Sequence, residues 1–185
     1  MVQSMDNSSN FEKSLCRGLW PKRKEDVLER HHVHTHYILK KGWDLTMEDV
    51  LIRTTVKKIS QSCPTLYLYA YEWPINTYRN DLGRGDLLWV DWEKRMMIVM
   101  EFKSLRGIGM AKGTNKRKRS KLSSQVEEYK DHVKKSVPFG VRVYGIGVTE
   151  DVDVLQKVSD CHRKQSLLEN RKIDDSPSFL YSGFL

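Results

Sequence analysis

The stretch from Gly83 to Lys103 constrains the fold most, because it predicts a β-hairpin with one strand buried on both faces. We expect a first strand over Gly85–Val90, a polar turn over Asp91–Arg95 and a second strand over Met96–Lys103. The second strand is an almost continuous apolar run, which is typical of a strand covered on both sides. The hairpin therefore belongs to a sheet with other elements packed on each face.

The open end of this hairpin is polar. Side chains alternate along a strand, so Glu101 and Lys103 point to one face and Phe102 to the other. Asp86 opens the partner strand, and a hairpin brings it to the same edge of the sheet. Two carboxylates form a hard oxygen site for Mg²⁺ or Mn²⁺, and a neighbouring lysine can polarise a phosphate or a water. The alternative is a surface hairpin that ends in a solvated Glu–Lys pair.

The segments around the hairpin predict an α/β protein. Thr46 is a suitable N-cap for a helix, and Asp49 stands at the reciprocal capping-box position. The further elements that we expect are a helix over Met47–Ser62, a strand over Thr65–Trp73, a helix over Leu122–Ser136, a strand over Gly140–Thr149 and a helix over Asp151–Glu169. The core order is then helix, strand, strand, strand, helix, strand, with a mixed central sheet flanked by helices.

Asp86 on one strand, followed by Glu101 and Lys103 on the next, resembles the signature of the PD-(D/E)XK nuclease superfamily. The core order also resembles that superfamily, whose restriction-endonuclease-like core runs α-β-β-β-α-β. The resemblance covers about Thr46 to Thr149. The chain departs from the pattern at the first acid, because Gly85 and not a proline precedes Asp86.

A second motif lies on the helix that follows. Gln125 and Tyr129 resemble the Gln-x-x-x-Tyr motif that follows the catalytic strand in RecB-type nucleases, and Holliday-junction resolvases share a similar core. Residues four apart lie on one helix face, so Gln125 and Tyr129 can line one cleft. The alternative places Tyr129 in the buried stripe and Gln125 on the surface.

The resemblance implies a divalent-metal-dependent nuclease that hydrolyses phosphodiester bonds in DNA, with structure selectivity left open and RNA not excluded. Asp86 and Glu101, with the Phe102 carbonyl, would hold Mg²⁺ or Mn²⁺. Lys103 would orient or deprotonate water, or stabilise developing charge. Gln125 and Tyr129 would position water or phosphate.

A third acid is expected beside this pair. Leu66, Leu68, Ala70 and Glu72 share one face if the strand is regular, and an acid at the end of an apolar face is costly unless it is paired or binds metal. We therefore favour Glu72 as a metal ligand over Glu48 from the preceding helix. A salt-bridged strand end is the alternative for Glu72.

The net charge of +8 is local, because the segment from Lys103 to Lys121 contains eight basic residues and no acidic one. We expect a basic loop over residues 104–121 that contacts a polyanion. The run Lys116–Arg119 is either a DNA contact or a nuclear-import signal. The expected nucleic-acid-binding residues are Arg79, Arg84, Arg106, Lys112, Lys116, Arg117, Lys118, Arg119 and Lys121.

The length predicts one domain over residues 19–172, with a flexible segment over 1–18 and a tail over 173–185. No apolar run approaches the roughly 20 residues that span a bilayer, and we expect no membrane association. Three separated cysteines favour an intracellular protein. The basic run Lys116–Arg119 predicts a nuclear location in a eukaryote, and otherwise we expect a cytoplasmic one. The sequence does not decide whether the protein forms a homodimer.

Two other classes of function compete with the nuclease. One is a catalytically silent nucleic-acid-binding module on the same fold, although the presence of Asp86, Glu101 and Lys103 together favours the enzyme. The other is a zinc-dependent interaction protein built on the cluster His31–His36, with Cys16 as a further ligand.

Overall fold

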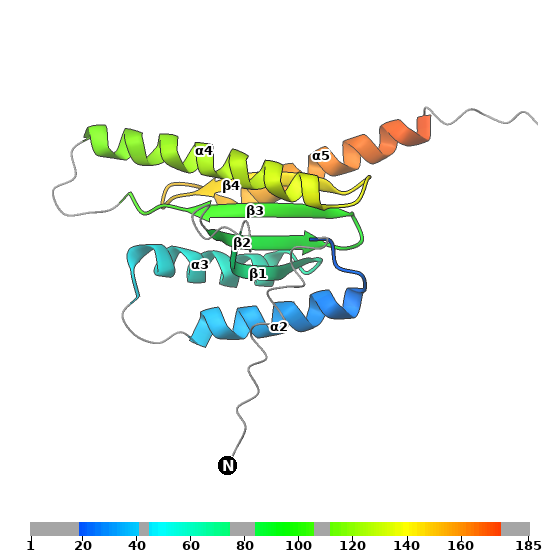
Figure 1. Ribbon diagram of the computed structural model, residues 1–185, viewed down its shortest axis with the longest axis horizontal. Coiled ribbons are helices and arrows are strands. Elements are labelled where there is room, and N and C mark those ends of the chain that lie inside the picture. The colour runs from blue at the N-terminus through cyan, green and yellow to red at the C-terminus, as the bar shows by residue number, and fades with distance from the viewer. Residues whose placement is uncertain (1–18, 41–44, 75–83, 106–111, 175–185) are drawn as a thin grey trace, which may run out of the picture.

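The computed structural model describes residues 19–40, 45–74, 84–105 and 112–174 (Figure 1). Its elements follow the predicted order after one additional N-terminal helix. They are α2 (Lys24–Lys40), α3 (Met47–Ser62), β1 (Leu66–Pro74), β2 (Arg84–Asp91), β3 (Met96–Phe102), α4 (Lys112–Ser136), β4 (Arg142–Val148) and α5 (Val154–Asp174). Among the helices described, none is both long and apolar enough to cross a membrane.

The four strands form one mixed sheet in the order β1-β2-β3-β4. β1 pairs with β2 and β2 with β3 in antiparallel fashion, whereas β3 pairs with β4 in parallel. Helices lie on both sides of this sheet (Figure 1). The predicted fold class, an α/β protein with a mixed central sheet flanked by helices, is confirmed.

The sheet separates two apolar cores, which explains the unbroken apolar sequence of β3. Ile98 faces the core that it shares with α3 and α5, and Val99 faces the core that contains Tyr129 and Val133 of α4. All residues of β3 are buried as a result. α2 packs against β1 at one border of the sheet.

Two glycines let α4 approach the sheet closely. A β-carbon on Gly145 would lie 2.5 Å from Val126 Cγ1, and one on Gly147 would lie 3.0 Å from Leu122 Cγ. Both distances are too short for a side chain, so β4 accepts the helix only because these positions lack one. These two contacts set the distance between the sheet and α4, the helix that carries Gln125.

The prediction of a basic loop over residues 104–121 is wrong for the second half of that range, because α4 begins at Lys112. Lysine and arginine are good helix formers, and residues 114–121 contain no glycine or proline. Residues 106–111 lie outside the described part of the chain. The basic run is therefore mounted on a helix that continues into the predicted Leu122–Ser136 segment.

Candidate active site

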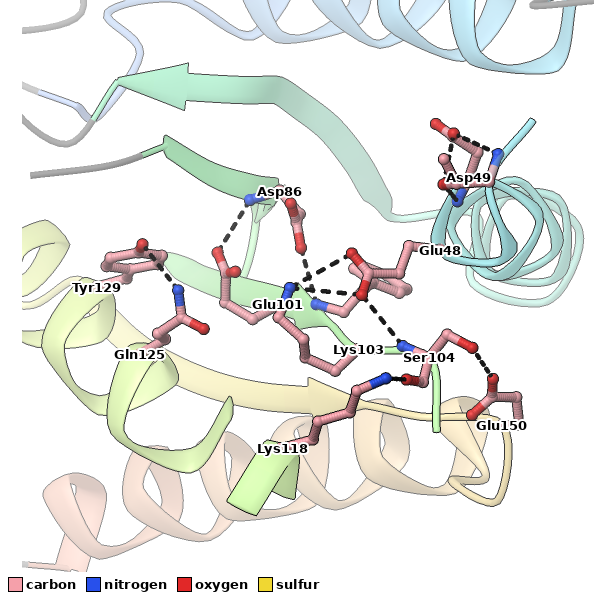
Figure 2. Close-up of polar contacts among 12 residues, drawn as sticks. Glu48, Asp49, Asp86, Glu101, Lys103, Ser104, Lys118, Gln125, Tyr129 and Glu150 are labelled. Carbon is pink, nitrogen blue, oxygen red and sulfur yellow. Dashed lines mark hydrogen bonds and ion pairs between the residues drawn. The ribbon is translucent and has the colours of Figure 1, made fainter. Parts of the chain in front are cut away.

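The start of β2 and the end of β3 bring Asp86 and Glu101 together. The register that pairs Leu87 with Met100 places these two acids side by side. The Asp86 N–H donates a hydrogen bond to Glu101 Oε1 at 2.9 Å, and the Phe102 N–H donates to Asp86 Oδ2 at 2.8 Å (Figure 2). Since the N–H and C=O of a strand residue point to the same side, the Phe102 carbonyl also points toward β2.

Burial makes this acidic pair costly to ionise. Glu101 is only 3% exposed, and burial together with the Asp86 charge raises its pKa to about 9. Burial also raises the pKa of Asp86, while Lys103 acts in the opposite direction on both acids. A bound cation favours the ionised form of such a pair. The chemistry of the donor set, two carboxylates and a backbone carbonyl, therefore fits a hard divalent ion.

Lys103 is held beside this pair by Glu48, from the first turn of α3. Lys103 Nζ lies 3.3 Å from Glu48 Oε2, and the Ser104 N–H donates to Glu48 Oε1 at 3.3 Å. The predicted capping box is present at the start of α3 and fixes the first turn that carries Glu48. In it, the Thr46 hydroxyl accepts the Asp49 N–H at 3.1 Å. The structure thus places Glu48 at the site.

Glu72 does not join this group. Leu68 faces one core and Ala70 the other, because the strand register shifts between them. Glu72 itself has φ 47°, which interrupts the regular alternation again. Its side chain is exposed and contacts Tyr71, whose pKa is raised by burial and by Glu72. The prediction that Leu66, Leu68, Ala70 and Glu72 share one face is therefore wrong, and Glu72 is not among the charges that act most on Asp86 and Glu101.

The chain leaving β3 is fixed by two side chains that sequence analysis did not place there. Glu150, which follows β4, accepts the Ser104 hydroxyl at 2.5 Å and the Leu105 N–H at 2.9 Å. Lys118 Nζ donates to the Ser104 carbonyl at 2.7 Å. Because β3 and β4 are parallel, their carboxyl ends meet at one edge, and this rule is the sequence signal for Glu150.

Gln125 and Tyr129 lie on the face of α4 that borders the acidic pair (Figure 2). Gln125 Nε2 donates to the Tyr129 hydroxyl at 3.4 Å, while Gln125 Oε1 is buried with no hydrogen-bond partner in the described structure. Burial raises the pKa of Tyr129, and the charges of Glu101 and Asp86 add to this effect. The predicted motif therefore reaches the site, with one amide oxygen left to accept a bond.

Packing explains the glycine before the first acid. A β-carbon on Gly85 would lie 2.6 Å from Trp73 Nε1, so the indole occupies the space that a side chain needs. Trp73 in turn contacts Tyr129 edge to face, with ring centroids 6.1 Å apart. Position 85 thus excludes proline in this chain.

The predicted nucleic-acid-binding residues divide into three groups. Arg84, Lys116, Arg117 and Lys121 are exposed. Lys118 and Arg119 have protein partners: Lys118 binds the Ser104 carbonyl, and Arg119 forms a 2.7 Å ion pair with Asp151. Arg79, Arg106 and the Lys112 side chain lie outside what the structure describes.

The histidine cluster is engaged with the protein. His31 Nδ1 accepts the Leu68 N–H at 2.9 Å, His32 stacks on His36, and burial lowers the pKa of His34 to about 4. Cys16 lies outside the described residues. Within the described ranges, no group of three or more His, Cys, Asp or Glu side chains could hold a metal ion. That statement covers both the histidines and the predicted set Glu72, Asp86 and Glu101.

No protein-family model, no curated protein and no solved structure matches this chain.

Proposed function

We propose that this protein is a divalent-metal-dependent nuclease that hydrolyses phosphodiester bonds in DNA. The observation that carries the proposal is the contact of the buried Glu101 with the half-buried Asp86, at the edge of the sheet beside Lys103. Buried like charges with strongly shifted pKa values are typical of functional sites. The sequence resemblance to PD-(D/E)XK nucleases supports the same interpretation.

Each residue has a role that its surroundings support. Asp86 and Glu101, with the Phe102 carbonyl, would hold Mg²⁺ or Mn²⁺, which activates water and neutralises phosphate charge when bound. Glu48 keeps the Lys103 ammonium at the site, where it can donate to a phosphate oxygen.

The α4 side of the site supplies a neutral acceptor. Gln125 Oε1 is buried and without a partner among the described residues, so it can accept a hydrogen bond from a water. Tyr129 holds the other end of the Gln125 amide. Gln125 would thereby orient the attacking water, and Tyr129 would keep the amide in place.

The test is cleavage of labelled single-stranded, duplex, flap and junction DNAs, and of RNA, with Mg²⁺, Mn²⁺ or a chelator. We expect metal-dependent cleavage of at least one DNA. Asp86→Asn and Lys103→Ala should each reduce the rate by about 10²–10³-fold, whereas Asp131→Asn, an exposed acid on α4, should not. Metal-dependent binding without cleavage of any substrate would favour the silent binding module.

Part of the exposed basic run is aligned with the site. Arg117, Lys121 and Gln125 follow one another at intervals of four along α4, so they lie on one face of the helix. This alignment supports a path for a phosphate backbone from Arg117 to the acids.

Arg117→Ser with Lys121→Ser should weaken duplex binding and reduce the slope of log affinity against log salt by roughly 1–2. Arg119→Ser is the matched control, because the Arg119 guanidinium is already paired with Asp151. Equal slopes for the double variant, the control and the parent would remove Arg117 and Lys121 from the DNA path.

A further inference from the structure

The two borders of the sheet differ in what covers them. α2 packs against β1 at one border. At the other border, the described residues place no strand beyond β4. The Arg142 N–H donates to the Arg95 carbonyl at 2.9 Å, and the Val148 carbonyl accepts the Lys103 N–H at 3.0 Å. The backbone groups of Arg142 and Val148 therefore face β3.

Alternate residues of β4 must then face outward, because successive residues of a strand direct their backbone groups to opposite sides. Those residues are Val143, Gly145 and Gly147. Among the described contacts, no hydrogen bond to their N–H or C=O groups is present beyond β4. The border thus presents a row of alternating donors and acceptors, which is the template for one more strand.

Two hollows lie along this border. One, of about 310 Å³, is lined by Leu122 and Val126 of α4 and by Gly145 and Gly147. The other, of about 440 Å³, is lined by residues of α4, β4 and α5. α4 and α5 contribute to opposite cores, so an added strand would extend the sheet between two helices that are already in place.

The second hollow is positively charged. Lys134 of α4, Arg142 of β4 and Lys164 of α5 line it, and no ion pair of theirs is present among the described residues. Lys130 also lines it but is paired with Glu127. Three cations from three different elements therefore surround the start of β4.

We propose that the open border of β4 binds an extended acidic segment of a partner protein, which adds to the sheet as a further strand. This interaction is separate from the proposed nuclease activity. The row of alternating N–H and C=O groups matches a peptide backbone, whereas phosphate groups offer acceptors only. The three cations select acidic side chains in that peptide.

Two other occupants fit this border less well. A second copy of the chain would pair its β4 antiparallel to the first across a two-fold axis, and the acids that follow β4, Glu150 and Asp151, are already engaged with Ser104 and Arg119. A strand that followed α5 in the chain would need a crossover on the face opposite to α4. That crossover has the opposite hand from the one between β3 and β4, and parallel crossovers have one strongly preferred hand.

The test uses the full chain and a fluorescein-labelled ten-residue peptide of alternating glutamate and valine, followed by fluorescence anisotropy at low salt. We expect saturable binding. The same peptide with alternate backbone amides N-methylated should bind at least about tenfold more weakly, because it loses several backbone hydrogen bonds. A peptide of alternating lysine and valine should not bind.

Variants of the protein locate the site. Val143→Pro removes an outward N–H and leaves the bonds of β4 to β3 intact, so it should weaken binding about tenfold. Val143→Thr keeps the N–H and should bind like the parent. Lys134→Glu with Lys164→Glu should weaken binding of the glutamate peptide about tenfold and allow the lysine peptide to bind.

Several results would overturn the proposal. Equal binding of the N-methylated peptide would exclude strand addition. Displacement of the peptide by duplex DNA, with Val143→Pro binding like the parent, would make the border a nucleic-acid surface. A dimer in sedimentation that dissociates when peptide binds would assign the border to a second copy. Peptide binding that requires removal of residues 175–185 would assign it to the chain itself. If Val143→Pro does not fold, the proposal is tested by the affinity of the N-methylated peptide for the parent and by the affinity of the charge-reversed variant for the two peptides.

Discussion

Asp91 and Glu101 are both buried acids of the central hairpin, at opposite ends of it, and their surroundings differ. Asp91 is 0% exposed, and its two oxygens accept hydrogen bonds from the Thr65 hydroxyl at 2.8 Å and the Lys94 N–H at 3.0 Å. Glu101 accepts the Asp86 N–H, but the side chain that it faces is the second acid.

This difference separates an acid that stabilises the fold from one that is available for chemistry. The donors around Asp91 come from the protein, and they fix the turn of the hairpin. At Glu101 the protein supplies a second negative group, and the Asp86 N–H and Lys103 oppose its effect on the pKa. Asp91 has its hydrogen-bond donors without a ligand, whereas we expect Glu101 to be stabilised by a bound cation.

The largest expected difference is in catalysis. Glu101→Gln removes the charge of a proposed metal ligand and should reduce single-turnover cleavage by about 10³-fold or more. Asp91→Asn should retain the parent rate per folded molecule. Rate constants measured at saturating metal on the best DNA substrate check this. A comparable loss in both variants would mean that the hairpin as a whole, and not the acidic pair, determines activity.

The second expected difference is in folding. Asp91→Ala leaves the Thr65 hydroxyl and the Lys94 N–H without their acceptor, and should lower the free energy of unfolding by about 2–4 kcal/mol. Urea unfolding followed by circular dichroism measures this. Glu101→Gln should cost less, because it removes a charge that burial disfavours. The comparison fails if the two variants rank in the opposite order.

The third difference is in the response to metal. Mn²⁺ at a hundred times its dissociation constant should stabilise the parent by about 2.7 kcal/mol, which raises Tm by roughly 5–10 °C in a domain of this size. Asp91→Asn should show the same increase, and Glu101→Gln should show almost none. Thermal melts with Mn²⁺ and with a chelator test this, and an equal increase in Glu101→Gln would place the metal elsewhere.

The fourth difference is in the pH dependence of stability without metal. The pKa of Glu101 is raised from 4.5 to about 9, so between these values the folded protein binds more protons than the unfolded chain. Stability from this group is then present at low pH and is lost as pH rises through the window, by at most about 1.4 kcal/mol per unit. Glu101→Gln lacks this proton, so its stability relative to the parent should increase from pH 5 to pH 8. Chelator-treated urea titrations check the sign.

The sequence predicted the fold well because its main signals are local. The apolar run of β3, the turn at Asp91–Arg95 and the capping box at Thr46 each depend on neighbouring residues. Asp86 and Glu101 meet as predicted because the hairpin fixes their register, and Lys103 follows directly at the end of β3, close enough to act on both acids. A short loop between paired strands leaves little freedom for these positions.

The failed predictions depended on regularity or on distant packing. Alternation along β1 pointed to Glu72, but a register shift after Leu68 and a positive φ at Glu72 break the period. Glu48 reaches Lys103 only because α3 docks with its first turn at the end of β3. No local sequence pattern predicts this docking, so the choice between Glu48 and Glu72 needed the structure.

The packing of Trp73 on Gly85 constrains how this site can change by substitution. Proline at position 85 collides with the indole, and Trp73→Ala alone leaves a cavity beside Tyr129 that costs about 3–5 kcal/mol. A Pro-Asp pair at positions 85 and 86 therefore requires two substitutions, and each one alone is destabilising. Positions 73 and 85 should behave as an epistatic pair. Gly85→Pro should destabilise the protein less when Trp73 has already been replaced by alanine.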